Sequence, residues 1–214
     1  MRLLLKRYAK ICQHKILEIK MNHPKHERTL VIIKPDGIQR SLVGEIVKRY
    51  EQIGLKLVGM KMLVPSEDLV EKHYTIDPEW VRLAGEKQIA SAKAGGRKLA
   101  SENPIELGTV VLGQLKKYLT SGPVVAMVWE GAHAVAIVRK VIGGTEPLSS
   151  DVGTIRGDFV IDSYALANQS GRAIRNLVHA SGSIKEAVDE VSHWFEKDEI
   201  IEYRLAQEAI LYEV

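Results

Sequence analysis

The stretch RTLVIIKPDGIQRSLVGEIVKRYEQIGLKLVGMKMLVP, residues 28–65, contains the signals that decide the fold. Residues 28–35 form a mostly apolar run that ends at a proline, which is typical of a buried strand. Residues 41–54 place apolar side chains at helical spacing, and Ser41 is the expected N-cap. Residues 55–64 are again mostly apolar, so we expect a second strand that is covered on both faces.

The region after this stretch predicts further helices and strands. Ser66 and the two acidic residues that follow it are typical of a helix N-terminus. Residues 77–106 contain AKAGGRK and SENP, which indicate loops rather than a regular element. We expect helices over residues 105–119, 132–144 and 183–195, and strands over residues 122–131 and 176–181.

The order of these elements indicates the fold class. Alternating strands and helices suit an α/β sandwich of the α+β kind, with helices on one face of a small sheet. The connections are short enough for antiparallel neighbours in places. We therefore expect a ferredoxin-like βαββαβ core with an antiparallel four-stranded sheet, plus inserted helical segments.

Composition limits the classes of protein that the chain can belong to. Cys12 is the only cysteine of the 214 residues, so the chain has no intramolecular disulfide and no multi-cysteine metal site. A single cysteine fits a reducing compartment, and we expect a cytoplasmic protein. No apolar run approaches the roughly 20 residues that a membrane-spanning helix needs, so we expect no membrane partner.

Charge is unevenly distributed along the chain. The formal net charge is +3, but residues 1–28 hold eight Lys and Arg against two Glu, so the remainder carries −3. Residues 1–27 are interpreted as a basic N-terminal extension; the alternative is that translation begins at Met21 and residues 1–20 are an upstream artefact. We expect no nucleic-acid binding by the body of the chain, since such binding needs a basic folded surface. Binding of nucleic acid through residues 1–28 is an alternative.

The segment RNLVHASGS, residues 175–183, places a histidine just ahead of a helix. Ser183 and Glu186 match the S-x-x-E pattern of a capping box, so a helix N-terminus faces back toward His179. Such an end favours anions, phosphate especially, and neutral imidazole. Glu190 lies on the same helix face as Glu186, and its carboxylate could orient His179 as a nucleophile. The alternative is a hydrogen-bonded core histidine at a strand end.

Several collinear motifs resemble the nucleoside diphosphate kinase family. They are residues 27–62, SGPVVAMVWEG, GTIRGDF and RNLVHASGS, in the family's order, and the resemblance covers residues 27–76 and about 113–205. It implies ping-pong transfer of a terminal phosphate from a nucleoside triphosphate to a nucleoside diphosphate through a phosphohistidine. ATP and other nucleotides would be the partners, and Mg²⁺ would arrive held mainly by their phosphates. A homo-oligomer, hexamer or tetramer, is also implied.

The resemblance assigns roles to individual residues. His179 would be the nucleophile, and Ser181 and Glu190 would support it. Lys34 would contact the phosphates and steady the transferring group, in line with phosphoryl transfer that depends on positioning and charge stabilisation. The other nucleotide contacts would come from Tyr74 beside the histidine, from Arg139, Thr145 and Arg156 on phosphate oxygens, and from Asn176 at the ribose.

Three departures from the family pattern affect what the resemblance implies. The family usually has Gly-Ser-Asp after the nucleophile, where this chain has Ala180, Ser181 and Gly182. The domain, residues 28–214, carries insertions near residues 77–112 and 160–174. Where the family supplies a base-stacking aromatic, the aligned residues here are Val111 and Leu112, so Trp80 and Tyr164 are the candidates to replace it. These departures leave a non-catalytic nucleotide-binding or scaffolding protein as the alternative function.

Overall fold

The computed structural model describes residues 26–96, 98–99 and 101–213. The two interpretations of residues 1–27, and binding of nucleic acid through them, fall almost wholly outside the described residues. None of the helices described combines the length and the apolarity that a membrane crossing requires.

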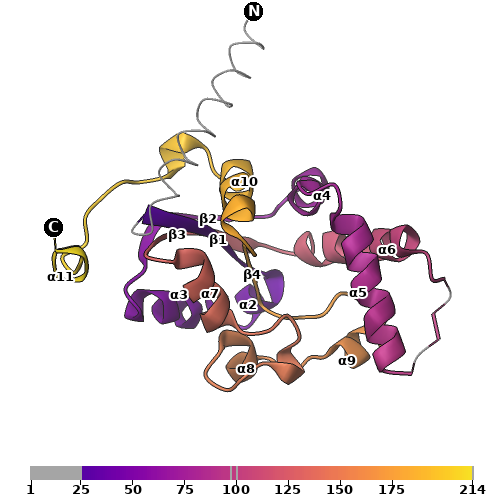
Figure 1. Ribbon diagram of the computed structural model, residues 1–214. Coiled ribbons are helices and arrows are strands. Elements are labelled where there is room, and N and C mark those ends of the chain that lie inside the picture. The colour runs from indigo at the N-terminus through magenta and orange to yellow at the C-terminus, as the bar shows by residue number, and fades with distance from the viewer. Residues whose placement is uncertain (1–25, 97, 100, 214) are drawn as a thin grey trace, which may run out of the picture.

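Four antiparallel strands form the centre of the molecule (Figure 1). They are β1 (Glu27–Ile33), β2 (Lys56–Leu63), β3 (Val124–Gly131) and β4 (Val178–Ala180), in the order β2-β3-β1-β4. This is the strand order of a ferredoxin-like βαββαβ core, so the predicted fold class is confirmed.

Helices cover both faces of the sheet, which corrects the expectation of helices on one face. Helices α3 (Val43–Gln52) and α7 (Ala134–Ile142) pack with Val31 and other residues of β1 and β3 on one side. Helix α10 (Ile184–Trp194) packs with Leu30 and its neighbours on the other side. All seven residues of β1 are buried because each of its alternating faces meets a helical layer.

The remaining helices fill the connections between core elements. They are α2 (Pro35–Gln39), α4 (Glu67–Thr75), α5 (Trp80–Ala94), α6 (Pro104–Leu119), α8 (Ile155–Phe159), α9 (Tyr164–Gln169) and α11 (Glu208–Tyr212), with single 3₁₀ turns at Pro147–Ser149 and Lys197–Glu199. The predicted helix after Ser66 is confirmed, and the Ser66 hydroxyl accepts a hydrogen bond from the backbone N–H of Leu69.

Three local expectations were wrong. Ser41 does not cap α3: it has a φ of 57° in the turn after the short helix α2, and Leu42 takes the N-cap position. Residues 77–106 are not loop throughout, because α5 occupies half of them and α6 begins at Pro104. The second half of β2 is not covered on both faces, since Met60 and Met62 are 46% and 61% exposed.

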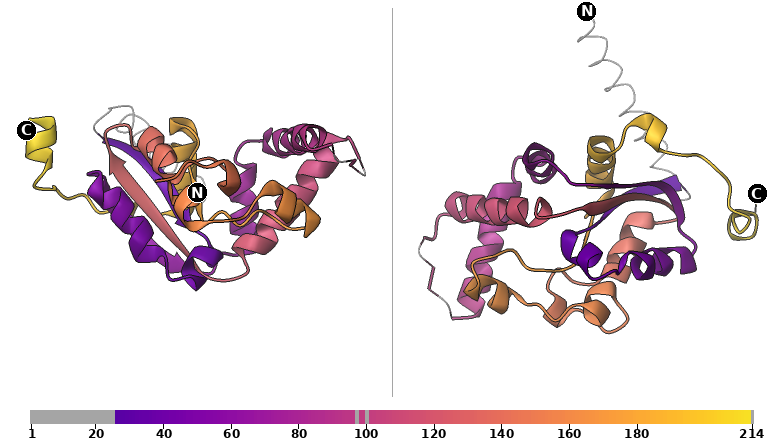
Figure 2. Two further views of the ribbon diagram at one scale, coloured as in Figure 1. Left: turned by 90° about the horizontal axis from the view of Figure 1, so that it is seen from below. Right: turned by 180° about the vertical axis from the view of Figure 1, so that it is seen from behind.

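The backbones of helices α5 and α6 are in direct contact. Gly85 in α5 faces Pro104, and Gly108 in α6 faces Val81; a Cβ at either glycine would lie 1.8 Å from the facing carbonyl oxygen. This helix pair stands to one side of the sheet (Figure 2). Its α5 member reaches the segment around α9, where Gln88 Nε2 donates to Asn168 Oδ1 at 3.0 Å.

The close packing predicts opposite effects for alanine at different glycines. Gly85→Ala and Gly108→Ala should each lower the free energy of unfolding by about 1–3 kcal/mol, because the added methyl group forces the helices apart. Gly113→Ala, also in α6, is the matched control: nothing lies within 4 Å of its Cβ, so helix propensity should stabilise it by roughly 0.5–1 kcal/mol. Denaturant unfolding of the three variants measures both effects. Destabilisation of all three alike would contradict the packing argument.

Candidate active site

The site is built around His179, which lies in the short edge strand β4 opposite Ile32 of β1. Its side chain is 17% exposed, so the ring is partly open to solvent. Helix α10 begins directly after β4 because the Ser183 hydroxyl accepts a hydrogen bond from the backbone N–H of Glu186 at 3.2 Å. The helix then returns toward the strand and brings Glu190 against His179.

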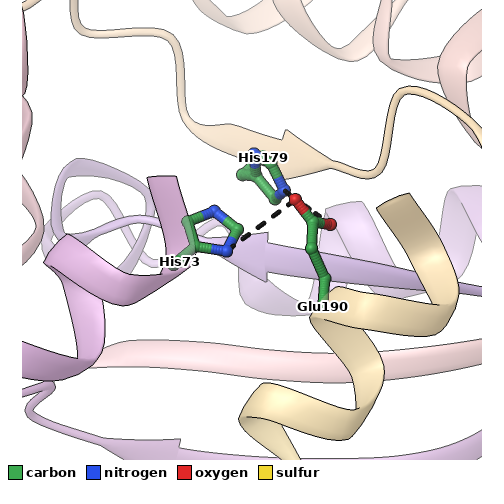
Figure 3. A group of neighbouring side chains, drawn as sticks. All are labelled: His73, His179 and Glu190. Atoms are coloured by element: carbon green, nitrogen blue, oxygen red, sulfur yellow. Dashed lines mark hydrogen bonds and ion pairs between the residues drawn. The ribbon is translucent and has the colours of Figure 1, made fainter. Parts of the chain in front are cut away.

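The contact between His179 and Glu190 determines which ring nitrogen is free. His179 Nε2 lies 3.0 and 3.1 Å from the two carboxylate oxygens of Glu190 (Figure 3). Burial alone would raise the pKa of Glu190, but the neighbouring His179, His73 and Ser181 outweigh it and hold the pKa at about 2. An ionised carboxylate only accepts, so Nε2 carries the proton and the lone pair is on Nδ1.

Ser181 fixes the second oxygen of the same carboxylate. Its hydroxyl donates to Glu190 Oε2 at 2.6 Å and accepts from the backbone N–H of Leu30 at 3.2 Å. Ser181 is fully buried, and the bond to Leu30 ties it to the central strand β1. Through Glu190 and Ser181, the orientation of His179 is therefore fixed relative to β1 at the centre of the sheet.

The two residues that depart from the usual family pattern fit their places. Ala180 is 6% exposed and belongs to the apolar cluster beneath α3 and α7. Gly182 donates its backbone N–H to Glu186 Oε2 at 3.0 Å, and a Cβ at this position would lie 2.8 Å from the same oxygen. The Gly182–Ser183 turn therefore closes on Glu186 without disturbing His179.

Lys34 and Asn176 form a second buried pair. Lys34 Nζ donates to Asn176 Oδ1 at 2.7 Å, and Asn176 Nδ2 donates to the carbonyl oxygen of Thr145 at 2.9 Å. Burial, followed by the positive charge of Arg156, lowers the pKa of Lys34 to about 7. These contacts connect the end of β1 with the loop after α7, and they fix the direction in which the Lys34 side chain points.

Arg156 is held by backbone carbonyl oxygens. Its guanidinium donates to the carbonyls of Gly143, Gly144, Asn176 and Val178 at 2.5–3.1 Å. Burial, followed by the charge of Arg139, lowers the pKa of Arg156 to about 10. Arg139 itself is exposed in the last turn of α7. Arg156 thus joins the loop after α7 to the strand that carries His179, and its charge lies beside Lys34.

Tyr74 is buried on the side of the site formed by α4. Its ring packs on His73 at 4.8 Å and on Trp80 at 4.9 Å between ring centroids, and burial raises its pKa. Trp80 and Leu112 pack against the apolar cluster that contains Tyr74. In the 160–174 insertion, the backbone N–H of Tyr164 donates to Glu146 Oε1 at 2.9 Å, which places α9 next to the loop of Thr145.

Sequence reasoning missed His73 and Trp194. His73 Nδ1 accepts a hydrogen bond from Trp194 Nε1 at 3.2 Å and lies 3.8 Å from Glu190 Oε1. Its ring packs edge-on against His179 at 4.4 Å. Burial, followed by His179, lowers the pKa of His73 to about 3, so this ring is neutral. The only signal in the sequence was its place directly before Tyr74.

Comparison with known proteins identifies relatives over most of the chain. A family model described as nucleoside diphosphate kinase matches residues 27–80 and 106–200. A nucleoside diphosphate kinase of Pyrobaculum aerophilum is 46% identical over 180 residues, which cover 82% of this chain and 98% of that protein.

Solved structures agree with the sequence comparison. The crystal structure of an NDP kinase from Pyrobaculum aerophilum has a TM-score of 0.80 and 44% identity, and the match covers 83% of this chain and all of that one. A transition state mimic of the Borrelia burgdorferi nucleoside-diphosphate kinase, with bound vanadate and ADP, has a TM-score of 0.73 and 35% identity. That match covers 88% of this chain and 98% of the other.

The bonding of Arg156 predicts that its shape matters in addition to its charge. Arg156→Lys keeps the charge but cannot reach carbonyls on both sides, so the free energy of unfolding should fall by roughly 2–4 kcal/mol. Arg139→Lys is the matched control, and its exposed position predicts a change within about 0.5 kcal/mol. Chemical denaturation compares the two variants. If Arg156→Lys is as stable as the parent, the carbonyl contacts contribute no stability.

Proposed function

The chain belongs to the nucleoside diphosphate kinase family, and we propose that its chemistry takes place at His179. Its activity is transfer of the terminal phosphate of a nucleoside triphosphate to a nucleoside diphosphate. The observation that supports His179 is the placement of Nε2 against Glu190, which leaves the Nδ1 lone pair free for attack. Because that pair is complete, the non-catalytic alternative is set aside.

The proposed reaction has two balanced half-steps. His179 Nδ1 attacks the terminal phosphorus of the triphosphate, an N–P bond forms, and the P–O bond to the departing nucleoside diphosphate breaks. The imidazole becomes positively charged in this step, and the carboxylate of Glu190 at 3.0 Å from Nε2 stabilises that charge. A second nucleoside diphosphate then attacks the phosphohistidine and regenerates neutral His179, which gives ping-pong kinetics.

Cationic and polar groups around His179 would hold the nucleotide. Lys34 would contact the phosphates and steady the transferring group. Arg139 and Thr145 are exposed and free to reach phosphate oxygens, and Asn176 would meet the ribose. Arg156 would contribute its positive charge to the phosphates while its carbonyl bonds keep the loop of Thr145 in place. Tyr74 would border the terminal phosphate from α4.

Mg²⁺ is proposed to be bound mainly by the nucleotide phosphates. The residues assigned to the phosphate oxygens are Lys34, Arg139, Thr145 and Arg156, whose side chains suit phosphate oxygens rather than a hard cation. The nearby carboxylate of Asp36 already accepts from Tyr118 Oη at 2.5 Å and from the backbone N–H of Leu177. When bound, Mg²⁺ would neutralise charge on the phosphates, and the protein groups would position them.

The two insertions are proposed to form one rim of the nucleotide site within a single domain of residues 28–214. The family model leaves residues 81–105 unmatched, and α5 spans most of them. The Gln88–Asn168 hydrogen bond then joins α5 to α9 of the second insertion. Trp80 and Tyr164, one from each insertion, would supply the aromatic surface for the base.

A homo-oligomer in the cytoplasm is proposed as the working form. Strand β2 is an edge strand with exposed Met60 and Met62, and such an edge favours pairing with another chain. A hexamer or tetramer would satisfy it. The single cysteine supports a reducing compartment.

The position of the phosphoryl group tests the proposed nucleophile. Protein labelled from γ-labelled ATP should carry phosphate on Nδ1 of His179, because Nε2 faces Glu190. The label should be acid-labile and base-stable, and comparison of digests with the two phosphohistidine isomers identifies the nitrogen. His179→Ala should lose all label, whereas His133→Asn, at an exposed histidine, should retain it. Labelling that survives His179→Ala refutes the assignment.

The lowered pKa of Lys34 predicts proton uptake on nucleotide binding. Phosphates raise the pKa of a lysine they contact, so at pH 8 Lys34 should pass from largely neutral to charged and take up to about one proton per ADP. At pH 6 the lysine is charged in both states and should take up none. Calorimetry of Mg·ADP binding in two buffers of different ionisation enthalpy measures the uptake, and Lys34→Gln serves as the control. Equal enthalpies in both buffers at pH 8 would contradict the prediction.

A further inference from the structure

Two imidazoles and one carboxylate meet behind the nucleophile. Figure 3 shows His73 and His179 facing the carboxylate of Glu190. One potential ligand atom of each of the three residues lies within 4.8 Å of the other two. Glu190 Oε1 lies 3.0 Å from His179 Nε2 and 3.8 Å from His73 Nδ1. The side chains of His73 and Glu190 are 1% and 7% exposed and that of His179 is 17% exposed, so the cluster is largely buried and His179 is its most exposed member.

Each member of the cluster is in a state that suits a metal. His73 is neutral, and its Nδ1 lone pair is engaged only by a neutral donor, the indole N–H of Trp194. Glu190 is ionised, and its two oxygens have lone pairs beyond those used by His179 and Ser181. His179 Nε2 becomes a ligand when the neutral ring changes tautomer, so that its proton moves from Nε2 to Nδ1.

We propose that His73, His179 and Glu190 form an inhibitory site for Zn²⁺. Two histidines and one carboxylate are a known ligand set for zinc, with a fourth position left for water. Mg²⁺ is a poor candidate because it prefers oxygen ligands in octahedral geometry. Zinc bonds of about 2.0–2.2 Å place tetrahedral ligand atoms roughly 3.3–3.5 Å apart, so side-chain shifts on the order of 1 Å are enough.

Zinc in this position would oppose phosphoryl transfer, so the inference rests on the proposed function of His179. The metal would replace the Nε2 proton and separate Nε2 from Glu190. The ring proton is then on Nδ1, so that nitrogen has no lone pair with which to attack phosphorus. The charges of Lys34 and Arg156 oppose the cation, so the site should bind zinc more weakly than a structural zinc centre does.

The first test compares zinc inhibition of ATP-dependent GDP phosphorylation in excess Mg²⁺. His73→Asn keeps an amide oxygen near Nδ1 to accept from Trp194 but removes the zinc-binding imidazole. The zinc concentration for half-inhibition should rise at least about tenfold in this variant. His133→Asn is the matched control: His133 is exposed with a φ of 54°, which asparagine tolerates, and its inhibition should equal that of the parent.

Unchanged inhibition in His73→Asn would overturn the proposal. That result would place the effect on zinc–nucleotide complexes or on other side chains, including Cys12 and the histidines of residues 1–26, all of which the variant retains.

The second test measures binding without turnover. In equilibrium dialysis with Zn²⁺ and no nucleotide, the full chain should bind one equivalent more than His73→Asn or Glu190→Gln, and the same number as His133→Asn. Equal stoichiometry in all four proteins would refute the site. If His73→Asn does not fold, Glu190→Gln decides the question. Failure of His179 labelling would instead refute the proposed function, since zinc stoichiometry does not depend on phosphoryl transfer.

Discussion

The buried carboxylate of Glu190 is the constraint on which the rest of the site depends. An ion of this kind taken out of water costs several kcal/mol unless hydrogen bonds and opposite charge compensate it. Here His179 and Ser181 supply the donors, and Ser181 is in turn bonded to β1. The same compensation that makes the ion tolerable therefore orients the imidazole. The start of α10 at Ser183 determines where that ion lies, so a helix cap sets the alignment of the carboxylate with His179.

The two buried cations of the site, Lys34 and Arg156, are also held in place by hydrogen bonds. Lys34 and Arg156 are both 5% exposed. Each donates to a neutral oxygen of Asn176, so Arg156 stays charged and Lys34 is able to take up a proton. Arg156 holds the backbone on both sides of the site, whereas Lys34 is held by the single amide of Asn176. One cation thus fixes the geometry of the loops, and the other is able to respond to a phosphate. Donors placed in advance reduce the reorganisation that phosphoryl transfer requires.

The sequence predicted the parts of this structure that depend on local chemistry. The strand at residues 28–35 and the caps at Ser66 and Ser183 could be read from hydrophobic runs and single hydroxyls. The helix over residues 105–119 was predicted despite its glycines, although only the structure explains Gly108, which faces α5. What could not be predicted depends on tertiary contacts. The second helical layer arises from packing of α10 on the distant strand β1, and α5 arises from its close packing against the next helix, α6.

The same limit applies to the site. His179 and Glu190 lie on neighbouring elements, so their spacing suggested the pair, and family resemblance supplied Lys34, Arg156 and Asn176. His73 reaches the site from α4, more than a hundred residues earlier, and no local pattern points from it to Glu190. Yet the neutral ring of His73 lies close to the Glu190 carboxylate, which therefore has two imidazoles beside it, those of His73 and His179. The features that support His179 as the proposed nucleophile, a neutral ring backed by an ionised carboxylate, are also those of a metal ligand. Under the two proposals, zinc on Nε2 would prevent attack by Nδ1, because the ring proton is then on Nδ1, and the surrounding cations would favour phosphate over zinc.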